Sequence, residues 1–114
     1  MRSISELASL KGRRAVVTGG AGHIGLAAAE ALLEMGARLV LLDLDLAETT
    51  RCANVLAERW PGMVVPVACD LADEELTRAA ARQVVALLGG LDILVHSAAF
   101  VGTTRTAGWS APFA

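Results

Sequence analysis

The 114-residue sequence is poor in several residue types, and each shortage excludes a class of protein. Tyrosine is absent, and Lys11 is the one lysine. Two cysteines, Cys52 and Cys69, cannot build a disulfide framework, so we expect buried, reduced thiols in a cytoplasmic protein. The two histidines, His23 and His96, are isolated, and no cluster of histidines and carboxylates has the spacing of metal ligands.

Charge and hydropathy narrow the class further. The formal net charge of −2 provides no basic surface for nucleic acid or anionic membrane. No uncharged apolar run reaches the roughly 18 residues of a membrane span, and Glu6 interrupts the weakly apolar N-terminus, which is therefore not a secretory signal. Hydrophobic residues make up 54% of the chain, and its mean hydropathy is +0.53. This composition and the length suit a single domain over residues 1–114. The apolar excess indicates either a buried parallel sheet or a surface that another part of the protein covers.

Apolar, β-branched runs alternate with helical patterns along the chain. The predicted strands are 15–18, 38–42, 63–68 and 91–95, preceded by an irregular lead-in over residues 1–13. Pro66 inside the third run indicates an edge strand, and Asp73 opens the third helix. The buried faces predicted for the first and third helices are Ile24, Ala28, Leu32 and Met35, and Leu76, Ala80, Val84 and Leu87. The order β-α-β-α-β-α-β predicts an α/β fold, a partial Rossmann-type doubly wound parallel sheet.

A glycine-rich turn follows the first predicted strand and opens the first helix. Gly19, Gly22 and Gly25 give the spacing T-G-x-x-G-x-x-G. The first glycine permits a tight turn, the second lets the backbone approach a pyrophosphate, and the third lets the helix pack closely. Backbone N–H groups at the start of the helix, around His23 and Ile24, would face the phosphates. His23 either donates to a phosphate or faces solvent.

An acidic residue ends the second predicted strand. Asp43 stands 18 residues after Gly25, where a carboxylate can accept both hydroxyls of an adenosine ribose and repel a 2′-phosphate. No arginine or lysine lies between Asp43 and Arg51 to bind such a phosphate. The sequence therefore favours NAD over NADP. Asp45 is a weaker candidate, because its side chain is expected to turn away from the ribose.

These residues together resemble the short-chain dehydrogenase/reductase family, over residues 12–101. The resemblance rests on the glycine turn, on Asp43, on Cys69-Asp70-Leu71 and on His96-Ser97-Ala98-Ala99. It implies that Asp70 contacts the adenine of the cofactor and that the backbone at Leu71 helps to hold it. It also implies that Ser97, Ala98 and Ala99 line the cofactor, in place of the Asn-Asn-Ala-Gly of the family, and that the strand order is 3-2-1-4.

Two branches of the family stay open. The T-G-x-x-G-x-x-G spacing is similar to the longer branch of sugar-nucleotide epimerases and dehydratases, because the shorter branch usually has glycine where this chain has His23. The short lead-in, the LDILVHSAA segment and the segment around Asp70 resemble the shorter branch, which we favour.

The catalytic groups of the family lie downstream of the fourth strand. The family uses a tyrosine as the acid, a lysine four residues on and a serine. This chain has no tyrosine, and Lys11 precedes the first strand. We therefore expect an NAD-binding first half of a longer, homo-oligomeric oxidoreductase, inactive by itself, with an unidentified small-molecule substrate whose side of the cleft begins in residues 100–113. The alternatives are a stand-alone NAD-binding module and a methyltransferase-like domain. The Thr18-Gly19 and Asp70-Leu71 pairs argue against the methyltransferase.

Overall fold

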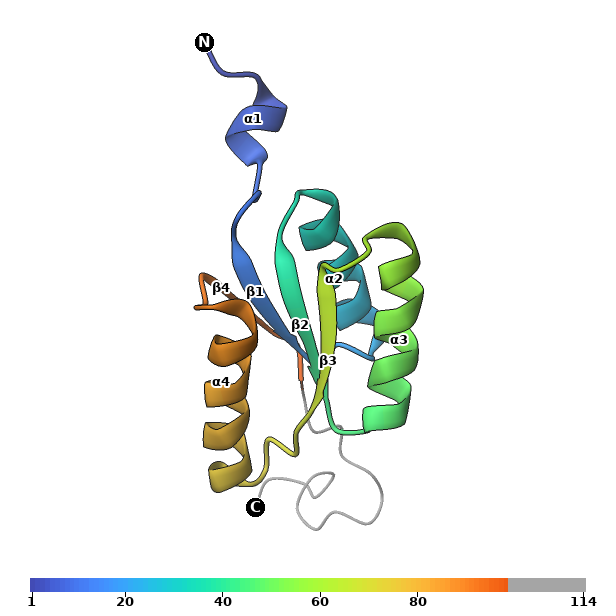
Figure 1. Ribbon diagram of the computed structural model, residues 1–114. Helices are drawn as coiled ribbons and strands as arrows, with labels where there is room; N and C mark the ends of the chain where they lie inside the picture. Colours follow the sequence, from blue (N-terminus) through green and yellow to red (C-terminus); the bar gives the residue numbers. More distant parts are fainter. Residues whose placement is uncertain (99–114) are drawn as a thin grey trace, which may run out of the picture.

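The computed structural model describes residues 1–98, which form a four-stranded sheet flanked by helices (Figure 1). Ala99 and the segment 100–113, for which the sequence makes predictions, lie outside the described residues. In chain order the elements are α1 (Ile4–Ala8), β1 (Arg14–Thr18), α2 (His23–Glu34), β2 (Arg38–Asp43), α3 (Leu46–Arg59), β3 (Val64–Ala68), α4 (Glu74–Leu88) and β4 (Ile93–His96). The predicted alternation of strands and helices is confirmed.

The sheet has the order β3-β2-β1-β4, and all three pairings are parallel. In the central register, Val16 of β1 lies opposite Val40 of β2 and Leu94 of β4. This order is the one that the family resemblance implies. Pro66 lies in β3, at the edge of the described sheet, as predicted.

Both faces of the sheet are covered, α2 and α3 lying on one face and α4 on the other (Figure 1). Successive side chains of a strand point to opposite faces, so β1 supplies Ala15 and Val17 to the first face and Val16 to the second. The buried residues on the α2–α3 face are Ala15, Val17, Ala29, Leu33, Leu39, Leu41, Cys52, Ala53 and Leu56. Those on the α4 face are Val16, Val40, Leu42, Val67, Cys69, Ala80, Val84 and Leu88. Each large side chain buried here contributes roughly 1.5–3 kcal/mol relative to exposure.

Caps define the ends of the longer helices. Asp45 and Asp73 are the N-cap residues of α3 and α4, and each carboxylate accepts a hydrogen bond from the backbone N–H three residues on. Gly36, at φ +102°, follows the end of α2, and Gly89, at φ +78°, caps α4 in the left-handed region that favours glycine. None of the helices in residues 1–98 combines the length and hydropathy that a membrane span needs.

The predicted helix faces were partly wrong. Ile24 and Leu76 are 77% and 52% exposed, although the periodicity placed them in the core. In α2 the buried residues are Gly25, Ala29 and Leu33. In α4 the predicted Ala80 and Val84 are buried, together with Leu88. In α2 nearly every position is apolar, so periodicity alone does not single out one face. The close approach of Gly25 to the preceding turn decides which face is buried.

The chain also differs from prediction at its first helix and its last strand. Residues 4–8 form α1 rather than an irregular lead-in, because Ser3 caps the helix by accepting from the backbone N–H of Glu6 at 3.2 Å. Figure 1 shows α1 standing apart from the sheet, and none of its residues is buried. β4 begins at Ile93 rather than at residue 91, since Asp92 bonds to Arg14 at the start of the strand.

Candidate dinucleotide-binding site

The loops after the four strands lie along one edge of the sheet and form the candidate site. β1 lies between β2 and β4, so the chain leaves β1 toward one side and later returns to pair with it on the other. At such a reversal of strand order the loops diverge, and open parallel sheets bind ligands in the crevice between them. The glycine turn follows β1 here, Asp43 ends β2, and Ser97 follows β4.

Gly19 turns the chain out of β1, and its surroundings accept no side chain. Its φ is +69°. A Cβ atom at this position would lie 2.7 Å from the backbone nitrogen of Ala98 and 2.8 Å from the carbonyl carbon of Ser97. The glycine turn and the loop after β4 therefore meet backbone to backbone, the tight geometry that the sequence predicts for Gly19.

Gly25 is the second point of close approach. A Cβ atom there would overlap the carbonyl oxygen of Gly19 and would lie 2.9 Å from the Ser97 hydroxyl oxygen. The absence of a side chain lets α2 start directly against the turn. The predicted reason for a glycine, close packing of the helix, is the reason that the structure shows.

Gly20 is a constrained position for which the sequence analysis gave no role. Its backbone N–H donates to the carbonyl oxygen of Leu42 at 3.1 Å. A Cβ atom would come within 2.5 Å of the Leu41 side chain. A sequence signal for this constraint was present: Gly19 and Gly20 are adjacent directly after a strand, whereas the T-G-x-x-G-x-x-G motif needs a glycine only at position 19.

Gly22 differs from the other glycines of the turn, because no protein atom crowds it. It is the N-cap of α2 at φ −83°, and a Cβ atom would have only the Gly19 carbonyl oxygen nearby, at 3.4 Å. His23 and Ile24, which begin the helix, are exposed. The N–H groups of a first helical turn have no partner within the helix and carry the positive end of its dipole. This end of α2 therefore has an open, electropositive backbone of the kind that can hold phosphate groups.

Asp43 is held against the glycine turn. One oxygen of its carboxylate accepts a hydrogen bond from the backbone N–H of Ala21 at 2.9 Å, and the other accepts from that of Leu44 at 2.7 Å. Each carboxylate oxygen has a second acceptor position. The half-buried carboxylate is thus oriented and still able to accept from two further donors such as ribose hydroxyls.

Asp45 has a different task. Its carboxylate accepts from the backbone N–H of Glu48 at 3.1 Å, and its carbonyl oxygen accepts from the Thr49 hydroxyl at 2.6 Å. The side chain is committed to the start of α3, which agrees with the prediction that it turns away from a ribose.

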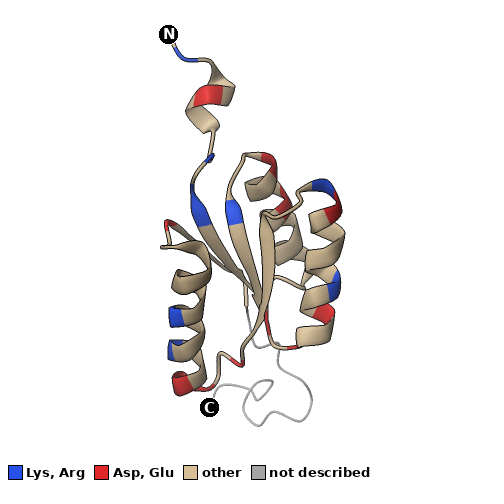
Figure 2. Cartoon of the chain, viewed as in Figure 1, with Lys and Arg blue, Asp and Glu red and all other residues tan. Residues whose placement is uncertain are grey.

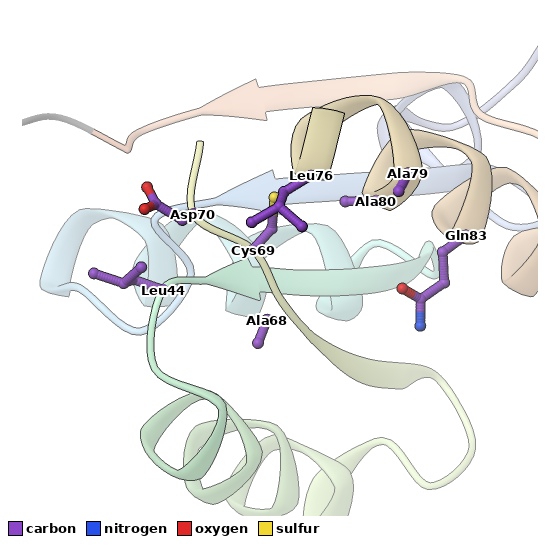
Figure 3. Close-up of a pocket in the computed structure, with 8 residues that line it drawn as sticks. All are labelled: Leu44, Ala68, Cys69, Asp70, Leu76, Ala79, Ala80 and Gln83. Atoms are coloured by element: carbon purple, nitrogen blue, oxygen red, sulfur yellow. The ribbon is translucent and has the colours of Figure 1, made fainter. Parts of the chain in front are cut away.

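A cavity of about 300 Å³ opens beside Asp70, between the ends of β2 and β3 and helix α4 (Figure 3). In Figure 3, Asp70 and Leu44 lie at one end of the cavity and Gln83 at the other. Asp70 also accepts from the backbone N–H of Ala72 at 3.0 Å, so it shapes the turn after β3. The residues that line the cavity are mostly apolar: Leu44, Ala68, Cys69, Asp70, Leu76, Ala79, Ala80 and Gln83. Such a cavity suits a flat heterocycle with one polar edge.

Leu71 lies outside this cavity. It is half-buried and lines a separate apolar groove between α4 and strands β1 and β4. The Asp70 side chain therefore lines the cavity, whereas the Leu71 side chain lines the groove. Contact of the Leu71 backbone with an adenine stays a prediction.

Side chains and backbone tie the loop after β4 to the end of β1. Ser97 donates its hydroxyl and its N–H to the Thr18 carbonyl oxygen, at 2.6 and 3.1 Å. The backbone N–H of Ala98 donates to the Thr18 hydroxyl oxygen at 3.4 Å, and that oxygen lies 2.7 Å from Nδ1 of His96. The expectation that Ser97 still bonds nearby backbone is confirmed, as is a hydrogen-bonded, structural His96.

Within residues 1–98 no group of three or more histidines, cysteines, aspartates and glutamates could hold a metal ion. Cys52 and Cys69 are free thiols, and both are buried, as expected. The sulfur of Cys69 contributes to the cavity beside Asp70 (Figure 3).

Arg14 and Asp92 fasten the opposite end of β4 to β1. The Arg14 guanidinium donates to both oxygens of Asp92, at 3.0 and 3.2 Å, and to the Gly89 carbonyl oxygen at 2.7 Å. The backbone N–H of Arg14 also donates to Asp92, at 2.9 Å. These hydrogen bonds and the positive charge hold the pKa of the Asp92 carboxyl below its ordinary value. Strand β4 is thus anchored at both ends.

Fold and site together define a Rossmann-type dinucleotide-binding domain. A glycine turn at the start of a helix, an acidic residue ending the second strand and a cavity beyond the third lie along the same edge of a parallel sheet. A family model described as short chain dehydrogenase matches residues 13–111. The chain belongs to this family.

Individual relatives agree with that assignment. The chain is 43% identical over 90 residues to the 15-hydroxyprostaglandin dehydrogenase [NAD(+)] of Bos taurus, covering 78% of this chain and 34% of the relative. A short chain dehydrogenase from Mycobacterium smegmatis superposes with a TM-score of 0.79 at 35% identity, over 85% of this chain and 40% of that one. The RhlG/NADP complex of Pseudomonas aeruginosa gives 0.75 at 36% identity, over 82% and 37%. The chain spans about a third of the length of the curated relatives it matches.

Proposed function

We propose that this chain binds NAD across the edge of its sheet, as the cofactor-binding part of an oxidoreductase. The pyrophosphate would lie against Gly22 and the first turn of α2, where His23 and Ile24 are exposed. The adenosine ribose would bond to Asp43, and the adenine would occupy the cavity beside Asp70. Gly19, Gly25, Ser97, Ala98 and Ala99 would shape the nicotinamide side. When bound, this cofactor supplies or accepts a hydride.

One observation carries the proposal. Gly19, Gly20 and Gly25 are each required by protein atoms that would meet a side chain, whereas Gly22 is crowded by none. A glycine without a protein neighbour at an uncapped helix N-terminus is explained by a ligand that approaches from outside. The Ala21 N–H bond fixes Asp43 beside this turn, so phosphate and ribose positions are preset together.

Calorimetric titration of the 114-residue chain with NAD tests this placement. Gly22→Val puts a branched side chain where the pyrophosphate would lie, and we expect binding to be lost or weakened at least tenfold. Ala27→Val, on an exposed position of the same helix, makes a comparable change away from the turn and should bind as the wild type does. Equal NAD affinity in Gly22→Val and wild type would refute the placement.

The relatives are much longer than the matched part of this chain, so the reaction of a complete protein is proposed separately from NAD binding. We propose that the complete protein, a cytoplasmic homo-oligomer, transfers hydride between NAD and an alcohol or carbonyl compound, and that residues 1–114 alone do not. The chain contains no tyrosine to act as the acid of the family. A panel of alcohols with NAD should give no NADH above a protein-free control. Turnover by the 114-residue chain would show that its own residues suffice.

A further inference from the structure

Glu48 and Arg51 form a two-point ion pair on α3. The Arg51 Nε atom donates to one carboxylate oxygen of Glu48 at 3.0 Å, and a terminal guanidinium nitrogen donates to the other at 2.5 Å. The two side chains are 64% and 47% exposed. The planar fork of the arginine is therefore engaged by a carboxylate in the geometry that it would also use for a phosphate.

Glu48 lies at the start of α3, where its backbone N–H donates to the carboxylate of Asp45, two residues after Asp43, at 3.1 Å. A guanidinium nitrogen of Arg51 and an oxygen of Glu48 lie 3.7 and 3.8 Å from the sulfur of Cys52. Burial raises the pKa of that thiol; the positive charge of Arg51 opposes the rise, and the negative charges of Glu48 and Asp43 add to it. The pKa of this thiol therefore depends on the charges of the ion pair and on the charge of Asp43, the carboxylate that would bind the ribose.

Three acidic residues lie in the short stretch from the end of β2 to the first turn of α3. Asp43 ends β2, Asp45 occupies the N-terminus of α3, and Glu48 follows in its first turn. Arg51 is the one basic residue between positions 43 and 58. Figure 2 shows acidic and basic residues alternating along the outer side of α3. The response of this region to an additional phosphate therefore depends on whether Arg51 is free.

We propose that Glu48 is a second residue that sets the preference for NAD over NADP. By pairing with Arg51, Glu48 keeps the guanidinium of that residue from a 2′-phosphate, and its own charge adds to the repulsion from Asp43. The inference rests on the proposed NAD site and assigns to α3 a part of the cofactor specificity.

The test compares the dissociation constants of NAD and NADP in Glu48→Gln. Glutamine keeps the size of the side chain and removes its charge. Exposed ion pairs contribute roughly 0.2–1 kcal/mol, so NADP should bind more tightly than to the wild type, by up to about fivefold, with NAD affinity unchanged. Glu74→Gln breaks the exposed pair between Glu74 and Arg78 on α4 and is the matched control, in which neither affinity should change.

A second background keeps the test decisive if wild-type affinity for NADP is too low to measure. In Asp43→Asn, adding Glu48→Gln should again improve NADP binding by up to about fivefold, and further adding Arg51→Gln should abolish the gain. If Gly22→Val abolishes NAD binding but adding Glu48→Gln leaves NADP affinity unchanged, the NAD site stands and the role proposed for Glu48 is wrong. If the wild type binds neither nucleotide, the proposed function itself fails.

Discussion

The carbonyl oxygen of Thr18 accepts two hydrogen bonds from one residue, Ser97, from its hydroxyl at 2.6 Å and from its N–H at 3.1 Å. The two residues are 79 positions apart in sequence. Their contact closes the glycine turn against the loop after β4, so that neither segment can move without the other. The backbone at Gly19 lies inside this junction, which makes the turn sensitive to small substitutions.

Gly19→Ala should destabilise the fold much more than Gly62→Ala. Both glycines have positive φ, +69° and +74°, so both substitutions incur the left-handed backbone cost of roughly 1–2 kcal/mol. Only at Gly19 does the new methyl group also meet backbone, that of Ala98 and Ser97; nothing lies within 4 Å of Gly62. We expect a total loss of about 3 kcal/mol or more for Gly19→Ala in urea unfolding. Equal losses in the two variants would mean that the junction yields easily.

Asp43→Ala should reduce the preference for NAD over NADP. Loss of charge-assisted hydrogen bonds to the ribose, together with loss of repulsion toward a 2′-phosphate, corresponds to about 1.5–3 kcal/mol, roughly a tenfold to hundredfold change in relative affinity. Asp43→Asn removes the charge but retains an oxygen that accepts from the Ala21 N–H. This variant therefore measures the effect of the charge while the glycine turn stays anchored. An unchanged ratio of NAD to NADP affinity in both variants would assign the preference to another residue.

The pair of Arg14 and Asp92 should make stability depend on acid pH. The pKa of Asp92 is lower in the folded chain than its ordinary value, because Arg14 bonds to its charged form. A lowered folded-state pKa contributes stability that is complete above the unfolded-state value, about 3.9, and is lost as the pH falls toward the folded-state value. Chemical unfolding between pH 6 and 2.5 should therefore show a steeper loss below about pH 4 in the wild type than in Asp92→Asn. Parallel curves for the two chains would contradict a contribution from this carboxyl.

The 114-residue chain should self-associate through the region around β4. In the described sheet β4 is an edge strand, Leu94 is 63% exposed, and the adjoining groove is lined almost entirely by apolar side chains. Unprotected edges and contiguous apolar surfaces promote pairing between chains. Leu94→Lys should lower the mass measured by light scattering, whereas Val55→Lys, at another exposed apolar residue, on α3, should not. A monodisperse wild-type monomer would refute the expectation.

The sequence was sufficient for the fold because the local signals agree with one another. Apolar runs, the Asp73 cap and the glycines after α2 and α4 all indicate the same alternation of strand and helix, and the structure contains it. The positions of Gly19 and Asp43 also followed from spacing, since a turn and a strand end are local features. Single-residue detail did not follow: nearly every residue of α2 is apolar, so its buried face depends on how closely Gly25 approaches Gly19.

Contacts between distant segments were not predictable from the sequence. The hydrogen bond from Ala21 to Asp43 and the clash that a side chain at Gly20 would make with Leu41 depend on the register of β1 with β2. The Leu71 side chain lines a different groove from Asp70, because adjacent side chains in the turn after β3 diverge. Spacing identifies which residues meet a ligand region, whereas tertiary packing decides their partners.

Pro66 makes the β3 edge of the sheet less able to pair with a further strand than the β4 edge. Directly after β3 the N–H of Cys69 donates to the carbonyl oxygen of Asp43 in β2. Since alternate residues of a strand donate to the same side, the backbone nitrogen of Pro66 faces away from β2. Proline has no N–H to offer a strand arriving there. The relatives are about three times as long as the part matched here, and strands added in a longer chain would extend the sheet from β4.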